Sequence, residues 1–344
     1  MSGTELFRRI SDYANAHQIG GVLRVTAADR IIHAQSFGLA DREAGIPFTE
    51  DSRFSFYSLS KPFCAIGLLK LYDRGLVDLD THPGKYVPEA AGFDARLTVR
   101  HLLHHVSGLP DFEQTPEFCR THLPGSTHLC RRHLSELSAF PAPFAPGEGA
   151  MYANVNFVIA ALIIENVSGL SYADYMRREV FDPLGMETAV VDREGLTIPH
   201  RVKGYELSPE GSPRAVEKSY DWMFGARDIV GTAEDAYALN RAVKHRMLLR
   251  EDTWAQALSP HPNNRMGMGC TVSRWGAKTR ITHNGGHTGF RTLHIHIPED
   301  DFDIILLSNS GWGDARGDMT DMIRDVFYSG EQRDVPIPMD TGYI

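Results

Sequence analysis

Short apolar runs near both ends of the chain predict β-strands. Near the N-terminus, Gly21–Thr26 and Ile31–Gly38 flank the polar turn Ala27–Arg30, a pattern typical of a β-hairpin. Four more runs of this kind follow near the other end, at Met266–Ser273, Lys278–His283, Gly289–Ile297 and Phe302–Ser308. Because tight turns join consecutive strands, these segments predict an antiparallel sheet.

The middle of the chain has apolar residues at helical spacing instead. Lys61–Arg74 shows this spacing and ends at Gly75. Further segments with helical patterns are Met1–Gln18, Val99–Val106, Asn154–Val167 and Ala315–Tyr328. The pairs Ser171 with Asp174 and Thr232 with Asp235 fit the capping-box pattern, which predicts two more helix starts.

These elements predict an α/β (α+β) fold in which strands from both ends of the chain form one antiparallel sheet. We expect terminal helices to flank this sheet and a mainly helical lobe to be inserted between its two halves. The expected single domain has an α/β lobe at about 1–75 and 225–330, a helical lobe at about 76–224, and an extended tail at 331–344. A cleft between such lobes is the usual place for a ligand site.

Composition adds limits on partners and location. Of the 344 residues, 42% are hydrophobic and 23% are charged, and the net charge of −9 argues against nucleic acid or an anionic membrane as a partner. Four scattered cysteines without a C-x-x-C pair predict free thiols: Cys64, Cys119, Cys130 and Cys270. The absence of a signal-peptide-like or membrane-length apolar run predicts a cytoplasmic protein.

The first candidate for chemistry is Ser58-Leu59-Ser60-Lys61, at the start of the helix predicted for Lys61–Arg74. Three residues along a helix place Ser58 and Lys61 on one face, close enough for hydrogen bonding. A serine hydroxyl is a weak nucleophile until a base removes its proton, and a partly desolvated lysine can be that base. Alone, the spacing S-x-x-K is common and carries little weight.

Two further motifs come from loops and strand ends. Tyr152-Ala153-Asn154 offers a phenol for proton transfer and a carboxamide that can hold both a lysine and a substrate carbonyl, although an asparagine there is also an ordinary helix cap. His283-Asn284-Gly285-Gly286 follows a predicted strand, and its glycines let the backbone approach a ligand. The alternative for this third motif is a glycine-rich hairpin turn.

Taken in order, S-x-x-K, Y-x-N and H-x-G make the chain similar to penicillin-binding proteins and serine β-lactamases. It most resembles the class C β-lactamase branch, with its esterases, D-aminopeptidases and D-amino-acid amidases. Other stretches that resemble this family are Phe54–Phe63, Gly75–Asp80, Lys85–Glu89, Leu97–Pro110, Pro183–Met186 and Gly231–Asp235. The resemblance implies a β-lactamase/transpeptidase-like fold.

The resemblance also implies a serine hydrolase that forms a covalent acyl-enzyme on Ser58, with Lys61 and Tyr152 moving protons. The N–H groups of Ser58 and Gly286 would bind the oxyanion. Asn154, His283 and Gly285 would bind the substrate. No metal or organic cofactor is required, and the expected substrate is a small ester, amide or short D-amino-acid-containing peptide.

One departure from the β-lactamases bears on the substrate. They have a lysine at the third motif where this chain has His283, and a mostly neutral imidazole binds a carboxylate less well than a fixed cation. The loop carrying Asp111, Phe112 and Glu113 should line the cleft by analogy, and an acid there could hold a substrate ammonium. A solvated loop carboxylate is an equally good interpretation of that segment.

Other functions remain open at this stage. Weak β-lactamase or D-Ala-D-Ala carboxypeptidase activity is one alternative, and a non-catalytic binding protein that retains the fold is another. The histidines at helical spacing, His101, His104 and His105, together with His294 and His296 on one strand face, invite a metal hypothesis. No nearby carboxylate and no H-E-x-x-H pattern completes a set of metal ligands, so we expect no metal site. The sequence pattern does not indicate an oligomeric state.

Overall fold

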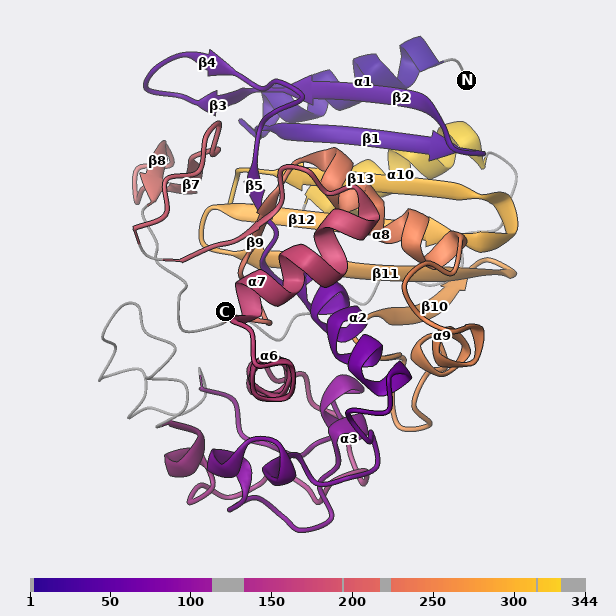
Figure 1. Cartoon of the computed structure of the whole chain (residues 1–344). Helices are drawn as coiled ribbons and strands as arrows, with labels where there is room; N and C mark the ends of the chain where they lie inside the picture. The colour runs from indigo at the N-terminus through magenta and orange to yellow at the C-terminus, as the bar shows by residue number, and fades with distance from the viewer. Residues whose placement is uncertain (1–2, 113–132, 194, 217–223, 314, 329–344) are drawn as a thin grey trace.

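A six-stranded antiparallel sheet forms the centre of the computed structural model, which describes residues 3–112, 133–193, 195–216, 224–313 and 315–328 (Figure 1). Its strand order is β10-β11-β12-β13-β1-β2. The strands are β1 (Gly21–Ala27), β2 (Arg30–Phe37), β10 (Thr271–Trp275), β11 (Lys278–His287), β12 (Phe290–Ile297) and β13 (Phe302–Ser308). Strands from both chain ends therefore share one sheet through the β1–β13 pairing, as predicted.

The two terminal helices cover one face of this sheet. On α1 (Gly3–Ala16), Leu6 and Ile10 are fully buried at a spacing of four residues. They belong to one apolar cluster with Leu23 of β1 and with Met319 of α10 (Ala315–Phe327). Figure 1 shows both helices behind the sheet, so burial of one helical stripe against alternate strand residues holds this layer together.

The other face of the sheet packs against the helical part of the chain. There α8 (Ala233–Lys244) contacts β12 and β13, and α2 (Ser60–Asp73) lies against α6 (Val155–Ser168). Every residue of α6 from Val155 to Ile164 is buried, so α6 is the central helix of this layer. Three shorter α-helices are α3 (Val99–Leu103), α7 (Tyr172–Met176) and α9 (Glu251–Ala257).

Several short elements were not predicted from the sequence. One three-stranded sheet has the order β5-β9-β6, from Phe54–Ser55, Ile229–Gly231 and Val190–Val191. Two hairpins pair β3 (Leu39–Asp41) with β4 (Ile46–Pro47) and β7 (Gly204–Leu207) with β8 (Pro213–Val216). Single helical turns lie at Tyr57–Leu59 (η1), Pro83–Lys85, Pro88–Ala90, Arg177–Phe181 and Asp182–Leu184. The β5–β9 pairing matters most, because it brings the segment before Ser58 beside the segment after Ala226.

Two predicted boundaries were wrong for identifiable reasons. Strand β10 begins at Thr271 rather than Met266, because Gly267 N donates to Cys270 O and Gly269 has a φ of +83°, which makes a turn there. Helix α3 ends at Leu103 rather than Val106, because His105 has a φ of +57° and leaves the helical conformation. The expected tail 331–344 lies outside the described residues, and the division into two lobes stays a prediction.

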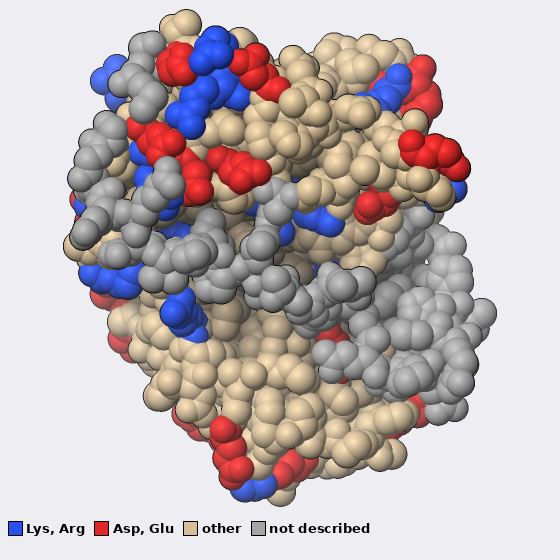
Figure 2. Space-filling model, turned by 180° about the vertical axis from the view of Figure 1, so that it is seen from behind, with Lys and Arg blue, Asp and Glu red and all other residues tan. Residues whose placement is uncertain are grey.

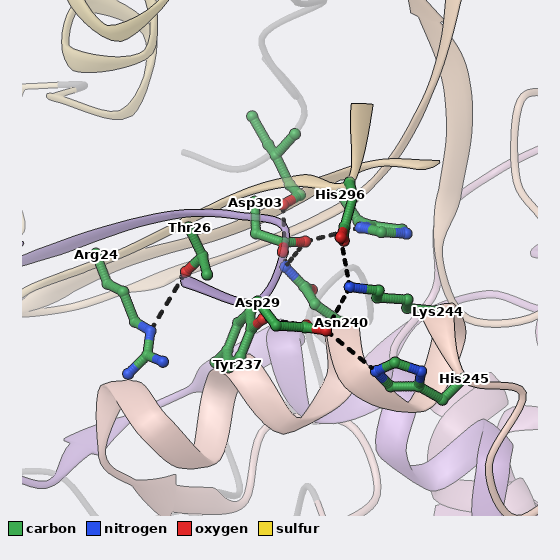
Figure 3. Close-up of polar contacts among 11 residues, drawn as sticks. Arg24, Thr26, Asp29, Tyr237, Asn240, Lys244, His245, His296 and Asp303 are labelled. Atoms are coloured by element: carbon green, nitrogen blue, oxygen red, sulfur yellow. Dashed lines mark hydrogen bonds and ion pairs between the residues drawn. The ribbon is translucent and has the colours of Figure 1, made fainter. Parts of the chain in front are cut away.

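A buried polar network ties α8 to the sheet (Figure 3). Asn240 Nδ2 donates to Asp303 Oδ1 at 2.8 Å, and His296 Nδ1 lies 2.7 Å from the same oxygen. Nearer the surface, Lys244 Nζ donates to Asp29 Oδ2 at 2.6 Å. Since buried polar groups need partners, this network fixes where α8 sits on β12 and β13.

Charged side chains of both signs are mixed on the surface. On the face shown in Figure 2, Lys and Arg side chains lie beside Asp and Glu side chains.

Within the described ranges no single helix is long and apolar enough to cross a membrane, while the bent pair Val155–Ser168 and Tyr172–Leu184, at 84° to each other, meets the criterion by length and composition only. Cys64 and Cys270 are free and buried.

Candidate active site

The turn η1 delivers Ser58 to the start of α2. Tyr57, the residue before it, has a φ of +52°, a conformation that costs energy for a side chain of this size and recurs at functional sites. Ser58 is 9% exposed and Lys61 is fully buried. Lys61 Nζ lies 3.1 Å from Ser58 Oγ, so the structure brings the two residues of the first motif into hydrogen-bond distance.

Lys61 also donates to two obligate acceptors. Its Nζ donates to Asn154 Oδ1 at 2.9 Å and to the Ala226 carbonyl at 3.0 Å. As an ammonium, Lys61 can donate to these two oxygens and to Ser58 Oγ together. Once it has lost a proton, the two obligate acceptors hold its two remaining hydrogens and its lone pair can face Ser58 Oγ.

The orientation of the Asn154 amide is set by Asp111. Asp111 Oδ2 accepts from Asn154 N at 2.9 Å and from Asn154 Nδ2 at 3.0 Å. Its Oδ1 accepts from Val155 N at 3.2 Å, at the start of α6. A carboxylate only accepts hydrogen bonds, so it turns the NH₂ of Asn154 toward itself and the amide oxygen toward Lys61.

This arrangement corrects the expectation for the loop after Pro110. Asp111 and Phe112 are both fully buried, so neither side chain lines a solvent-open cleft wall. The carboxylate of Asp111 is occupied by backbone and amide donors rather than being available to a substrate ammonium. Glu113 lies outside the described residues.

Tyr152 lies directly against Lys61. Lys61 Nζ is 4.7 Å from the centroid of the Tyr152 ring, and the same ring stacks on the imidazole of His105 at 4.3 Å with an interplanar angle of 21°. The residues of S-x-x-K and Y-x-N, which are far apart in the sequence, thus form one group. The face of the Tyr152 ring therefore contacts the lysine, which places the phenol beside Lys61 and Ser58.

His283 lies on β11 opposite His294 of β12 and is 6% exposed. Its Nδ1 lies 2.7 Å from the Asn284 carbonyl, so Nδ1 carries the hydrogen. Burial, followed by the charge of Lys61, lowers the pKa of His283 to about 3. The imidazole is therefore neutral at ordinary pH, and its ring centroid is 6.4 Å from that of Tyr152.

The glycines of the third motif let β11 run against the nucleophile turn. A Cβ on Gly285 would lie 2.0 Å from the Phe56 carbonyl oxygen and 3.2 Å from Leu59 N, so only glycine fits there. On the other side of this strand, Arg316 Nη1 donates to the Gly285 carbonyl at 3.3 Å. Gly286 pairs with Arg291 across the β11–β12 ladder.

Three residues at the site were not found from the sequence. Ala226 contributes only a backbone carbonyl, which leaves no mark in a motif, and Arg316 comes from α10, more than 250 residues after Ser58. His105 was considered only as one of three histidines at helical spacing. Within the described residues no group of three or more His, Cys, Asp or Glu side chains has the arrangement of a metal site.

Comparison with known proteins gives the class and the family of the chain. The fold and the S-x-x-K motif together define a protein of the serine hydrolase class. The chain belongs to the Beta-lactamase family, whose model matches residues 6–326. It is 30% identical to a penicillin-binding protein of Bacillus subtilis (strain 168) over 85% of this chain and 68% of that one. It is 27% identical to esterase EstB of Burkholderia gladioli, over 90% of this chain and 91% of the esterase.

A solved structure shows the same fold. D-amino acid amidase from Ochrobactrum anthropi SV3 superposes with a TM-score of 0.78, over 95% of this chain and 98% of the amidase, at 24% identity. The predicted fold class, an antiparallel sheet with flanking helices of the β-lactamase/transpeptidase type, is confirmed.

Proposed function

We propose that this protein is a serine hydrolase that forms a covalent acyl-enzyme on Ser58. The observation that carries the proposal is the environment of Lys61: a buried amine 3.1 Å from Ser58 Oγ that also donates to Asn154 Oδ1 and to the Ala226 carbonyl. A lysine held in this way can take the serine proton without a strong base elsewhere.

The reaction follows from these positions. Lys61 Nζ removes the hydrogen of Ser58 Oγ as this oxygen bonds to the substrate carbonyl carbon, and the carbonyl oxygen gains the negative charge. In our proposal the backbone N–H groups of Ser58 and Gly286 stabilise that oxyanion, and each such donor is worth about 3 kcal/mol of barrier. Tyr152 gives a proton to the leaving alcohol or amine and regains one from Lys61. A water molecule then releases the acyl group by the same steps in reverse.

The substrate class follows from the neutral third motif. His283 is uncharged at ordinary pH and provides no fixed cation for a β-lactam carboxylate. We therefore propose a small ester, an amide or a short peptide containing a D-amino acid as substrate. The relatives named above include an esterase, and a D-amino acid amidase shares the fold, which supports this choice.

A fluorophosphonate probe tests the nucleophile directly. Incubation of the full chain at pH 7 to 8.5, followed by intact-mass measurement, should show one covalent adduct, and Ser58→Ala should show none. The labelled protein should then be compared with unlabelled protein on p-nitrophenyl esters and D-aminoacyl amides. If the wild type gains no adduct, the hydrolase proposal fails and the binding-protein alternative replaces it.

A further inference from the structure

We propose that His105 is a positioning residue for Tyr152, holding the phenol against Lys61. This inference rests on the proposed function, because it assigns Tyr152 a part in the reaction. It is carried by three contacts that His105 makes with three consecutive residues around the phenol.

The backbone carbonyl, the ring nitrogen and the ring face of His105 each contact a different residue of the segment Met151–Ala153. Its carbonyl oxygen accepts from Met151 N at 3.0 Å. Its Nδ1 accepts from Ala153 N at 3.1 Å. Its ring stacks on that of Tyr152 at 4.3 Å. His105 therefore holds the backbone on either side of Tyr152 and packs against one face of the phenol.

A second donor fixes the protonation state of the imidazole. Ser107 Oγ donates to Asn156 Oδ1 at 2.7 Å, which turns the NH₂ of Asn156 toward His105 Nδ1, 3.2 Å away. With two N–H donors pointing at Nδ1, that nitrogen carries no hydrogen and Nε2 does. Burial, followed by the charge of Lys61, holds the pKa of His105 well below its ordinary value. The imidazole of His105 is therefore neutral, and it does not compete with Lys61 for the proton of Ser58.

The backbone of His105 is also unusual. Its φ of +57° lies in the left-handed region, where residues other than glycine are uncommon and where Asn, Asp and His are the least disfavoured. This turn is what directs both the carbonyl and the side chain at the Y-x-N segment. Such conformations persist where the surroundings hold them, and they cluster at functional sites.

The neighbouring His104 provides the contrast with a merely structural histidine. It is almost as buried, at 5% exposure against 1% for His105. Its Nδ1 donates to the Met266 carbonyl at 2.9 Å, and its ring lies 5.6 Å from that of His261. These contacts are to Met266 and His261 rather than to Ser58, Lys61 or Tyr152, so His104 serves as a matched control.

Two substitutions separate the ring from the acceptor. His105→Asn keeps an acceptor near the Nδ1 position and tolerates the positive φ, but it removes the stacked ring. His105→Phe keeps an aromatic ring and removes the acceptor. We expect kcat for p-nitrophenyl ester hydrolysis to fall about 100-fold in His105→Asn, since small misplacement of a reacting group can cost this much, with KM changed less than threefold. We expect a smaller loss of kcat in His105→Phe, and kcat within twofold of wild type in His104→Asn.

A readout that does not depend on turnover completes the test. With 3-fluorotyrosine incorporated at position 152, the ¹⁹F resonance should shift and broaden in His105→Asn and stay unchanged in His104→Asn. If His105→Asn keeps both kcat and the ¹⁹F resonance while its Tm falls as in His104→Asn, the positioning role is overturned. If the resonance shifts but wild-type protein neither turns over esters nor reacts with fluorophosphonate, then His105 does orient Tyr152 and it is the proposed hydrolase function that fails.

Discussion

At the scale of single residues, reactivity depends on a chain of fixed hydrogen-bond directions. Asp111 can only accept, so it orients the amide of Asn154, and the amide oxygen in turn accepts from Lys61. Lys61 Nζ also lies 3.1 Å from Ser58 Oγ. A buried carboxylate thus orients the amide that holds the lysine which we propose as the base.

The substitution Asp111→Asn tests this chain of directions. It removes the negative charge and places an NH₂ group where one of the accepting oxygens had been, opposite the donors of Asn154 and Val155. We expect a loss of about 1–3 kcal/mol in the free energy of unfolding, because buried donors lose an acceptor. We also expect the rate of fluorophosphonate adduct formation to fall at least tenfold.

The same change at the exposed Asp174, which accepts from Ser171 Oγ at 2.6 Å, is the control and should leave the adduct rate unchanged. Thermal denaturation and time-resolved intact mass give both quantities. An Asp111→Asn protein that labels as fast as wild type would show that the orientation of Asn154 does not depend on this carboxylate.

At the scale of elements, local patterns were enough for those whose signal lies within a few residues. The hairpin of β1 and β2, the central helix α6 and the capping box of Thr232 with Asp235 were predicted and found. The sheet β5-β9-β6 was missed because its strands have two or three residues and pair with distant segments: Phe54 pairs with Gly231 and Val190 with Val230. Strands this short form only by pairing with their neighbours, so the sequence shows no hydrophobic alternation that would predict them.

The candidate site divides in the same way. Ser58, Lys61, Tyr152 and Asn154 were predicted from motifs, and the structure brings their side chains together. Asp111 was expected at the cleft wall by analogy with the family, with a solvated loop carboxylate as the equal alternative. Its burial follows from tertiary contacts with α6 that sequence spacing does not contain.

The turn at Gly225–Asp228 carries a prediction at this scale. It places the Ala226 carbonyl on Lys61, and it is closed by Asp228 Oδ2, which accepts from Gly225 N at 2.6 Å. Burial raises the pKa of Asp228 to about 7, from 3.8 in an unfolded chain. Between these values the unfolded state releases a proton that the native state keeps, so this group's contribution to stability is lost as pH rises, by up to about 1.4 kcal/mol per pH unit.

Asp228→Asn removes the ionisation while leaving an oxygen that can accept from Gly225 N. We expect the variant to gain in Tm relative to wild type as pH rises from 5 to 8, and to differ least at pH 5. Differential scanning calorimetry at both pH values measures this. Parallel Tm curves for the two proteins would mean that Asp228 is already ionised in the native state.

At the scale of the whole molecule, the buried histidines set the response to acid. Burial is the first cause of a lowered pKa in five of them. The pKa is lowered for His33, reaches about 4 for His104 and about 3 for His283, and lies well below the ordinary value for His105 and His294. In an unfolded chain each gains a proton near pH 6.5. Since only the unfolded state gains these protons, stability is present above pH 6.5 and is lost as pH falls toward the native pKa values, by up to about 1.4 kcal/mol per pH unit for each histidine.

His294 isolates one such contribution, because its ring packs among apolar residues of α2 and α8, on β12 opposite His283. It is fully buried, and neither ring nitrogen has a hydrogen-bond partner in the part of the chain that the structure describes. Its ring lines a small cavity with apolar neighbours such as Ile66, Leu239 and Ile281. An apolar side chain of similar size would remove two unsatisfied polar atoms, each worth about 1–3 kcal/mol.

We therefore expect His294→Leu to be more stable than wild type and to lose less stability between pH 7.5 and pH 5.5. The free energy of unfolding should fall less steeply with pH, by up to about 1.4 kcal/mol per pH unit, which is the contribution of one proton. The contribution of Asp228 has the opposite sign over this range, so the difference between variant and wild type is the quantity to measure, by urea unfolding at both pH values. His17→Gln, at an exposed histidine, should leave the slope unchanged. If the free energy of unfolding of His294→Leu changes with pH as steeply as that of wild type, then His294 is protonated in the native state and its lowered pKa is refuted.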